Sequence, residues 1–341
     1  MAGLLLAGIR WQLLFSLPSN HARGCACHAT ECTLDAMPPI TSAELIVNAR
    51  SGFEDKEEVR RRLQEVFAAA GVETQISIAQ SGAQVVELAQ RAAHGSSQVV
   101  VAGGGDGTIN AVGSAIVESD KILGVLPLGT LNHFAQDLKI PLNLEDAARA
   151  IISGHTASVD VGEVNGHIFL NNSSLGLYPT IVREREKQQR LGYGKWRALI
   201  WAALTVLRRY PFLDVQLYAE GKKFTRRTPF VFVGNNEYAM ESFQIGRRHC
   251  LNAGQLSLYI TPRTSRLGLL WLGLRGLFGR LRNDKDFLAI CTTELTIETR
   301  RKHQRRLRVA FDGEVDVLET PLHYRVRPGA LRVIVPVQEK E

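Results

Sequence analysis

The sequence predicts an α/β protein: an N-terminal doubly wound domain followed by a second domain that is mainly an antiparallel β-sandwich. Up to about residue 155, short apolar runs typical of buried strands alternate with segments of helical periodicity, and glycine-rich loops follow two of these strands. Beyond that point short β-type runs dominate, and the length of 341 residues suits two domains.

The first domain is assigned to residues 41–155, after a loose extension of residues 1–40 without a regular pattern. Strands that alternate with helices favour a parallel sheet. Met37 lies just before the first regular pattern and is a candidate start of the mature chain. The elements expected in this domain are strands at 44–48, 72–79, 98–102 and 121–126, and helices at 54–70, 83–93 and 108–116.

The second domain is assigned to residues 156–341, with a last strand or tail that returns to the first domain. Asn165-Gly166 between two β-type runs is a strong signal for a two-residue hairpin. Helical insertions are expected around 183–209 and 265–282. The remaining strands are expected at 159–164, 167–170, 213–219, 229–233, 256–260, 294–298, 307–311 and 331–335.

Charge and cysteine content indicate which partners and which cellular compartment to expect for the protein. A formal net charge of +7 indicates an anionic partner (a nucleotide, a nucleic acid or an acidic membrane surface), or else a plain basic face. The five cysteines form no disulfide framework, and Cys250 and Cys291 stand far from the others. This pattern suits a reducing compartment, and no apolar run is long enough to span a membrane, so we expect a cytoplasmic protein.

A glycine-rich loop follows the strand expected at 98–102 and leads into a helix. Backbone N–H groups at a helix N-terminus bind phosphate, and glycines allow its close approach. The loop is neither a Walker motif nor a dinucleotide fingerprint, and a tight turn capped by Asp106 or Thr108 is the structural alternative. The candidate phosphate-binding residues are Gly103, Gly104, Gly105, Asp106, Gly107, Thr108 and Asn110.

A second loop, with Gly129, Thr130 and Asn132, ends the next strand. Ligands of open α/β sheets bind at the carboxyl ends of the strands, where short polar side chains can contact phosphate or ribose. Taken alone, this is an ordinary loop with a helix cap. Beside the first glycine loop, it is predicted to form the other wall of a nucleotide cleft.

The segments GGGDGTINAV and PLGTLNHFAQDLKIP together resemble the diacylglycerol kinase catalytic-domain family, which is related to sphingosine kinases. The resemblance extends over residues 44–336 and includes Asn171 to Gly176 and Phe311-Asp312-Gly313-Glu314. It implies a nucleotide-binding α/β domain, a lipid-substrate β domain, and Mg²⁺- and ATP-dependent phosphorylation of a lipid hydroxyl in the cleft between them.

The resemblance also implies roles for individual residues. Gly104 to Asn110 and Thr130 would hold the ATP phosphates, and Asn48 and Ser51 would lie at the first nucleotide contact region. Glu314 matches the proton acceptor of the family and Asp312 its neighbouring acid. From the residues alone, Asp312-Gly313 is a plain hairpin turn.

Metal binding is expected mainly at Asp106, which could orient Mg²⁺ or share the role of the base. Related bacterial kinases often carry an Asp-Asp-Gly-Leu-Leu-Asp loop for a structural Mg²⁺ in the second domain. Here Asn252, Ala253 and Ser257 stand at the acidic positions, and Mg²⁺ prefers carboxylate oxygen. We therefore expect the structural site to be absent or weak.

Several functional questions stay open at this level. An NAD kinase-like enzyme, with Asn235-Asn236-Glu237 as its dinucleotide contact, and a non-catalytic lipid or nucleotide sensor are the alternatives. Basic residues at 265–282 and 300–306 fit peripheral contact with an acidic membrane, but a helix packed on the β domain and a solvated hairpin tip explain them equally well. Neither segment is typical of a nucleic-acid platform. Edge strands permit a homodimer. The acceptor lipid is not determined by the sequence.

Overall fold

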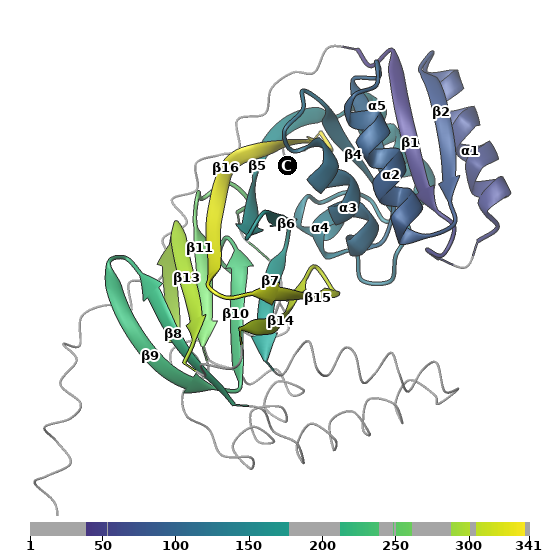
Figure 1. Cartoon of the computed structure of the whole chain (residues 1–341). Helices are drawn as coiled ribbons and strands as arrows, with labels where there is room; N and C mark the ends of the chain where they lie inside the picture. The colour runs from purple at the N-terminus through teal and green to yellow at the C-terminus, as the bar shows by residue number, and fades with distance from the viewer. Residues whose placement is uncertain are drawn as a thin grey trace, which may run out of the picture.

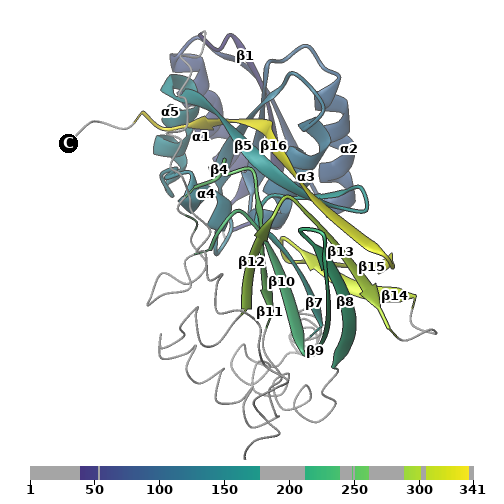
Figure 2. The same ribbon diagram turned by 90° about the vertical axis from the view of Figure 1, so that its left-hand side faces the viewer.

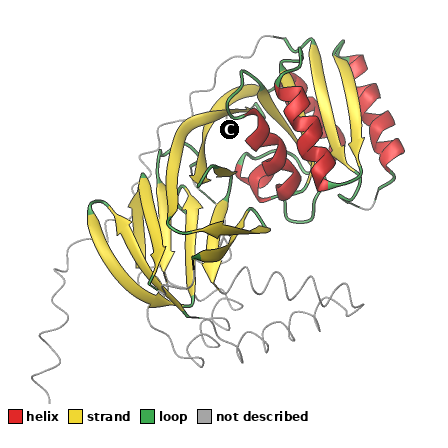
Figure 3. Cartoon of the chain, viewed as in Figure 1, coloured by secondary structure: helices red, strands yellow, loops and turns green. Residues whose placement is uncertain are grey.

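The computed structural model describes residues 39–52, 54–176, 212–238, 248, 250–260, 288–300 and 305–337. The described helices all belong to one domain, and the other domain is built from strands (Figures 1 and 3). The helices are α1 (Lys56–Ala69), α2 (Gly82–Ala93), α3 (Asp106–Ile116), α4 (His133–Asp137) and α5 (Leu144–Ser153). The strands of this helical domain are β1 (Ser42–Asn48), β2 (Glu73–Ala79), β3 (Val99–Gly104) and β4 (Ile122–Pro127).

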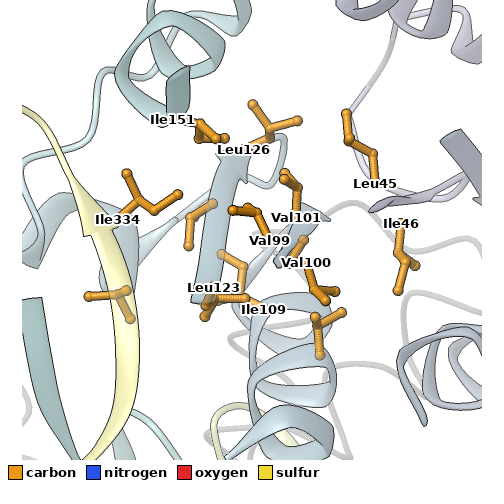
Figure 4. Packing of buried hydrophobic residues seen from close by; sticks show 14 of the residues in the cluster. Leu45, Ile46, Val99, Val100, Val101, Ile109, Leu123, Leu126, Ile151 and Ile334 are labelled. Carbon is orange, nitrogen blue, oxygen red and sulfur yellow. The ribbon is translucent and has the colours of Figure 1, made fainter. Parts of the chain in front are cut away.

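The four strands of the helical domain form a parallel ladder in the order β2-β1-β3-β4. Strands β3 and β4 are buried at every position because helices cover both faces of the sheet. Helices α2 and α3 lie together on one face and α1 and α5 on the other (Figure 2). Aliphatic side chains from both faces form the core shown in Figure 4.

Local sequence explains where these helices begin. Asp55 accepts a hydrogen bond from the N–H of Glu57 at the start of α1, and Ser81 and Asn143 cap α2 and α5 in the same way. Helix α1 buries Val59, Leu63 and Phe67, which recur at helical spacing. Helices α1, α2 and α5 therefore each begin at a capping side chain and pack one apolar stripe on the sheet.

A long C-terminal strand joins the two domains. Strand β16 (Leu322–Val335) pairs antiparallel with β5 (His155–Val164) and contacts the parallel strand β4 through Val333 and Leu123. Its register shifts between Arg327 and Leu331, where a bulge bends it. The sheet then continues through β13 (Glu294–Thr299), β8 (Leu213–Ala219) and β9 (Lys222–Thr228), so one sheet of 10 strands runs through both domains.

The second sheet of the β domain has the order β12-β11-β10-β7-β14-β15 and is antiparallel throughout. Its inner face packs on the first sheet around buried residues such as Leu175, Val231 and Leu258. The predicted fold class is thereby confirmed. The remaining strands are β6 (His167–Phe169), β7 (Asn172–Gly176), β10 (Phe230–Asn235), β11 (Leu256–Ile260), β12 (Leu288–Thr292), β14 (Arg306–Phe311) and β15 (Glu314–Glu319).

Some elements differ from the expectations. The sequence pattern missed β7, β9, β12, α4 and α5, and the helical insertions expected around 183–209 and 265–282 lie outside the described residues. The expectation that the cysteines form no disulfide is wrong for Cys250 and Cys291, because both are disulfide-bonded, and the cysteine pattern therefore no longer supports a reducing compartment. Their spacing in the sequence could not predict this, because the fold brings segments that are distant in the sequence together in the same β domain. Among the described helices, none has the length and apolar character that a membrane crossing needs.

Candidate functional site

The first glycine loop carries the chain from β3 into α3 with little room for side chains at Gly103 and Gly104. A Cβ on Gly104 would lie 2.5 Å from the Thr108 hydroxyl oxygen, and one on Gly103 would lie 3.1 Å from Val47. The N-cap of α3 is Gly105, which offers no side chain to the first amide groups of the helix. Neither Asp106 nor Thr108 is the N-cap, so the loop presents backbone donors as an anion site requires.

The second loop packs directly on the first. A Cβ on Gly129 would lie 2.4 Å from the Cα of Gly105, so only glycine permits the contact. Asn132 adopts φ 52° and holds its own loop: its side-chain oxygen accepts from Gly129 N at 3.0 Å, and its Nδ2 donates to Pro127 O at 3.2 Å. The structure therefore uses this side chain to shape the loop.

Asp106 connects the two loops. Its carboxylate accepts the N–H of His133 at 3.2 Å and of Phe134 at 3.1 Å, the first amides of α4. A carboxylate at a helix N-terminus satisfies donors that the helix itself leaves unpaired. Asp106 thus fixes the second loop against the first, in addition to any contact with a ligand.

Asn48, at the end of β1, contacts the helix that follows the first loop. Its Nδ2 donates to the hydroxyl oxygen of Thr108 at 2.9 Å, and its Oδ1 accepts from Arg50 N at 3.0 Å. Thr108 is buried at the same point. The carboxyl ends of β1 and β3 therefore meet at one edge of the sheet, as expected for a ligand site of an open α/β fold.

The hairpin of β14 and β15 contributes the acidic residues. Asp312 and Gly313 form its two-residue turn with φ of 47° and 90°, the positive values of a type I′ turn. The buried Asp312 carboxylate accepts N–H groups from Leu170 (2.6 Å), Asn171 (2.9 Å) and Asn172 (3.0 Å). Burial raises the pKa of Asp312 to about 6 although these amides oppose the shift.

Glu314 is the first residue of β15 and reaches across to the first glycine loop. Its Oε1 lies 3.4 Å from the position that a Cβ on Gly107 would occupy. Partial burial raises the pKa of Glu314 above the ordinary value of a glutamate. A carboxylate from the β domain is therefore placed beside the first turn of α3.

These groups line a cavity of about 480 Å³. Six predicted site residues contribute to it: Asn48, Ser51, Gly105, Gly107, Thr108 and Glu314. Sequence reasoning missed the start of α2 and one residue of α3, which supply small and aliphatic side chains on one wall. These are Gly82, Ala83, Val85, Val86 and Ala111. A helix start without charged residues gave no signal in the sequence, and only the topology places it here.

Other predicted residues support the cavity from outside its lining. Gly103, Gly104 and Gly129 set the loop backbones, and Asp106 and Asp312 bind amides as described. Asn110 is buried and its Nδ2 faces Ile168 O at 3.5 Å, whereas Thr130 is exposed on the second loop.

No cluster of three or more His, Cys, Asp or Glu side chains that could hold a metal occurs among the residues the structure describes. Asp106 keeps spare lone pairs beside the loop, and Mg²⁺ in nucleotide sites is commonly held by one or two carboxylates together with the phosphates. The residues fit a metal that arrives with a nucleotide.

Two family models match the chain, one in each of the two domains. Residues 42–164 match the family model described as diacylglycerol kinase catalytic domain, and residues 178–335 match the YegS C-terminal NAD kinase beta sandwich-like domain. Residues 42–164 therefore form a domain of the diacylglycerol kinase catalytic type. The sequence resemblance is thereby confirmed, and the second match agrees with the observed β-sandwich.

Curated relatives include the diacylglycerol kinases of Staphylococcus aureus, which are 30% identical over 197 residues, 56% of this chain and 61% of theirs. The diacylglycerol kinase of Staphylococcus carnosus is 30% identical over 187 residues, 53% of this chain and 60% of its own length. The matched segment thus spans less than two thirds of these relatives.

Solved structures show the same fold. A crystal structure of a diacylglycerol kinase from Bacillus anthracis str. Sterne aligns with a TM-score of 0.65 and 20% identity over 88% of this chain and 99% of its own. Another structure from the same organism aligns with a TM-score of 0.71 and 23% identity over the same shares.

Proposed function

We propose that the protein is an ATP-dependent lipid kinase that transfers the γ-phosphate of ATP to a hydroxyl group of a diacylglycerol-like lipid. One observation carries the proposal: Glu314, from the β domain, lies beside Gly107 at the start of α3 in the same cavity. A base and a phosphate-binding helix N-terminus are two of the features that phosphoryl transfer to an alcohol needs.

In the proposed reaction, the lipid hydroxyl oxygen forms a bond to the γ-phosphorus and its proton passes to the Glu314 carboxylate. The bond between the γ-phosphorus and the bridging oxygen breaks, and ADP leaves with the electron pair. The first amides of α3 orient the phosphates, with Asn48 and Thr108 beside them. Mg²⁺ bound with ATP would neutralise phosphate charge, and Asp106 is the residue proposed to contact it.

The two domains divide this work in our proposal. Residues 41–155 bind the nucleotide and residues 156–341 bind the lipid, with Glu314 contributed from the second. The similarity to diacylglycerol kinases and the basic net charge of +7 support peripheral contact with an acidic membrane, and a cytoplasmic location stays a prediction. A homodimer through sheet edges stays a prediction.

The structure favours the lipid kinase over an NAD kinase-like enzyme. Two of the three residues interpreted as a dinucleotide contact lie in the interior of the β domain: Asn235 is 1% exposed and its Nδ2 donates to Asp160 O and Leu170 O. Asn236 is 0% exposed, and its side-chain oxygen accepts from Ala253 N. Neither side chain is presented to a ligand.

The test is transfer of labelled γ-phosphate from ATP and Mg²⁺ to micellar diacylglycerol, a sphingoid base, phosphatidylglycerol or NAD. Label in a lipid that is lost in Glu314→Gln and in Asp106→Ala supports the proposal. Glu319→Gln is the matched control, because Glu319 is an exposed carboxylate on the same strand paired with Arg306. Label in NAD, or nucleotide binding without transfer to any acceptor, would refute it in favour of the NAD kinase or the sensor.

A further inference from the structure

A buried ion pair joins the two domains away from the cavity. The Arg248 side chain is 0% exposed and that of Asp137, the last residue of α4, is 3% exposed. The Arg248 Nε donates to Asp137 Oδ2 at 2.7 Å, and the backbone N–H of Arg248 lies 3.3 Å from Asp137 Oδ1. Such a pair costs desolvation free energy and persists only where hydrogen bonds satisfy it fully.

The rest of the guanidinium group donates hydrogen bonds to the bend at residues 170–172, which leads into β7. Nη1 of Arg248 donates to Leu170 O at 2.7 Å, and Nη2 donates to Asn171 Oδ1 at 2.8 Å. The amides of Leu170, Asn171 and Asn172 donate in turn to Asp312. Arg248 therefore donates to oxygen atoms of this bend, and Asp312 accepts from the backbone amides of the same bend.

Helix α4 continues this series of contacts to the phosphate loop. Its first two amides, of His133 and Phe134, donate to Asp106, and its last residue is Asp137. The Phe134 ring lies 5.9 Å from the Arg248 guanidinium carbon. A continuous set of hydrogen bonds thus runs from the first glycine loop, through α4 and Arg248, to the turn that precedes Glu314.

We propose that Asp137 and Arg248 form a positioning pair, which holds the hairpin that carries Glu314 in register with the phosphate-binding start of α3. The inference rests on the proposed kinase function and extends it to residues that do not line the cavity. Glu314 and α3 belong to different domains, so their separation depends on what fixes one domain against the other. A misplacement of about 1 Å can cost roughly 10²-fold in rate.

The variant that isolates this role is Arg248→Lys. A lysine keeps the charge beside Asp137 but cannot also reach Leu170 O and Asn171 Oδ1, because it lacks the planar fork. We expect Arg248→Lys to fold and to bind ATP within about twofold of the wild-type Kd, while kcat falls about 10- to 100-fold. Asp137→Asn, which keeps the shape and removes the charge, should lower kcat in the same direction.

The matched control is Arg62→Lys. Arg62 also makes a forked contact, to Glu145, but this contact joins α1 to α5 within the nucleotide domain. We expect its kcat to equal that of the wild type. A purely structural role for Arg248 would instead reduce the fraction of protein that binds nucleotide and leave kcat per binding site unchanged, and that result would overturn the proposal.

A second measurement does not depend on catalysis. Hydrogen–deuterium exchange should be at least about tenfold faster at residues 170–172 in Arg248→Lys than in the wild type, with exchange in α3 unchanged. Wild-type exchange at this bend together with wild-type kcat in Arg248→Lys would overturn the proposal. If the wild-type protein transfers no phosphate, the kinase function fails, whereas faster exchange in the variant would still support the link between α4 and the turn.

Discussion

The contact between the two glycine loops makes Gly129→Ala a sharp test of the site. A Cβ at this position would lie 2.4 Å from the Cα of Gly105 and 2.7 Å from the side-chain oxygen of Asn132. An ordinary contact needs about 3.4 Å or more, so the two backbones must separate by about 1 Å. Overpacking of this kind costs about 1–3 kcal/mol, and the displaced loop carries the amides that we propose to bind phosphate.

We expect Gly129→Ala to lower the free energy of unfolding by about 2 kcal/mol in urea titrations. Its affinity for ATP should fall at least tenfold in a binding titration, about 1.4 kcal/mol. Gly95→Ala is the control, because its Cβ would meet Ala92 O and Glu44 Oε2 at 3.4 Å, away from the site. Wild-type stability and affinity in Gly129→Ala would show that the loops are not in contact as described.

Four further predictions concern the pH dependence of two carboxylates, one hydrogen bond and the removal of metal. Burial raises the pKa of Asp312 from 3.8 to about 6, so between these pH values the folded protein holds a proton that the unfolded chain has lost. Its free energy of unfolding should fall by up to ~3 kcal/mol as the pH rises through this range, and this slope should be absent in urea titrations of Asp312→Asn. The raised pKa of Glu314 should make kcat/KM fall in rate assays as the pH drops through that raised value, because the proposed base becomes protonated. Asn48→Ala, which removes the 2.9 Å bond to Thr108, should raise the Kd for ATP about three- to tenfold in a binding titration. Chelation followed by dialysis should leave the Tm unchanged, because the loop at 251–257 is held by hydrogen bonds from Ala253 N and Gly254 N; a lower Tm would indicate a structural metal.

The fold class could be predicted because each strand and helix of the first domain carries its own periodicity. The buried strands β3 and β4 are continuous apolar runs, and α1 repeats apolar residues at helical spacing. Short or polar elements escaped prediction. Strand β9 (Lys222–Thr228) is highly charged because it is an edge strand exposed to solvent, and α4 has only five residues.

The glycine loops were recognisable because their chemistry depends on backbone conformation, which glycine reports directly in the sequence. The aliphatic wall at the start of α2 was not, because Val85 and Val86 are ordinary helix residues until the topology turns them toward the cavity. Asp312 shows a third case. Its hairpin-turn interpretation and its site assignment are compatible, because the same residue that forms the type I′ turn also binds the bend at 170–172.

Arg248 marks the limit of what sequence alone can provide. It lies in a segment without a recognisable motif, and its partners come from α4, from the bend at 170–172 and from β10. A buried arginine is costly unless nearly every N–H finds an acceptor, so the position can be occupied only when these distant segments meet in one arrangement. Because burying this charge is costly, Arg248 can be accommodated only if the two glycine loops keep a fixed position relative to the turn before Glu314. Such a requirement follows from the tertiary structure and leaves no periodic or local trace in the sequence.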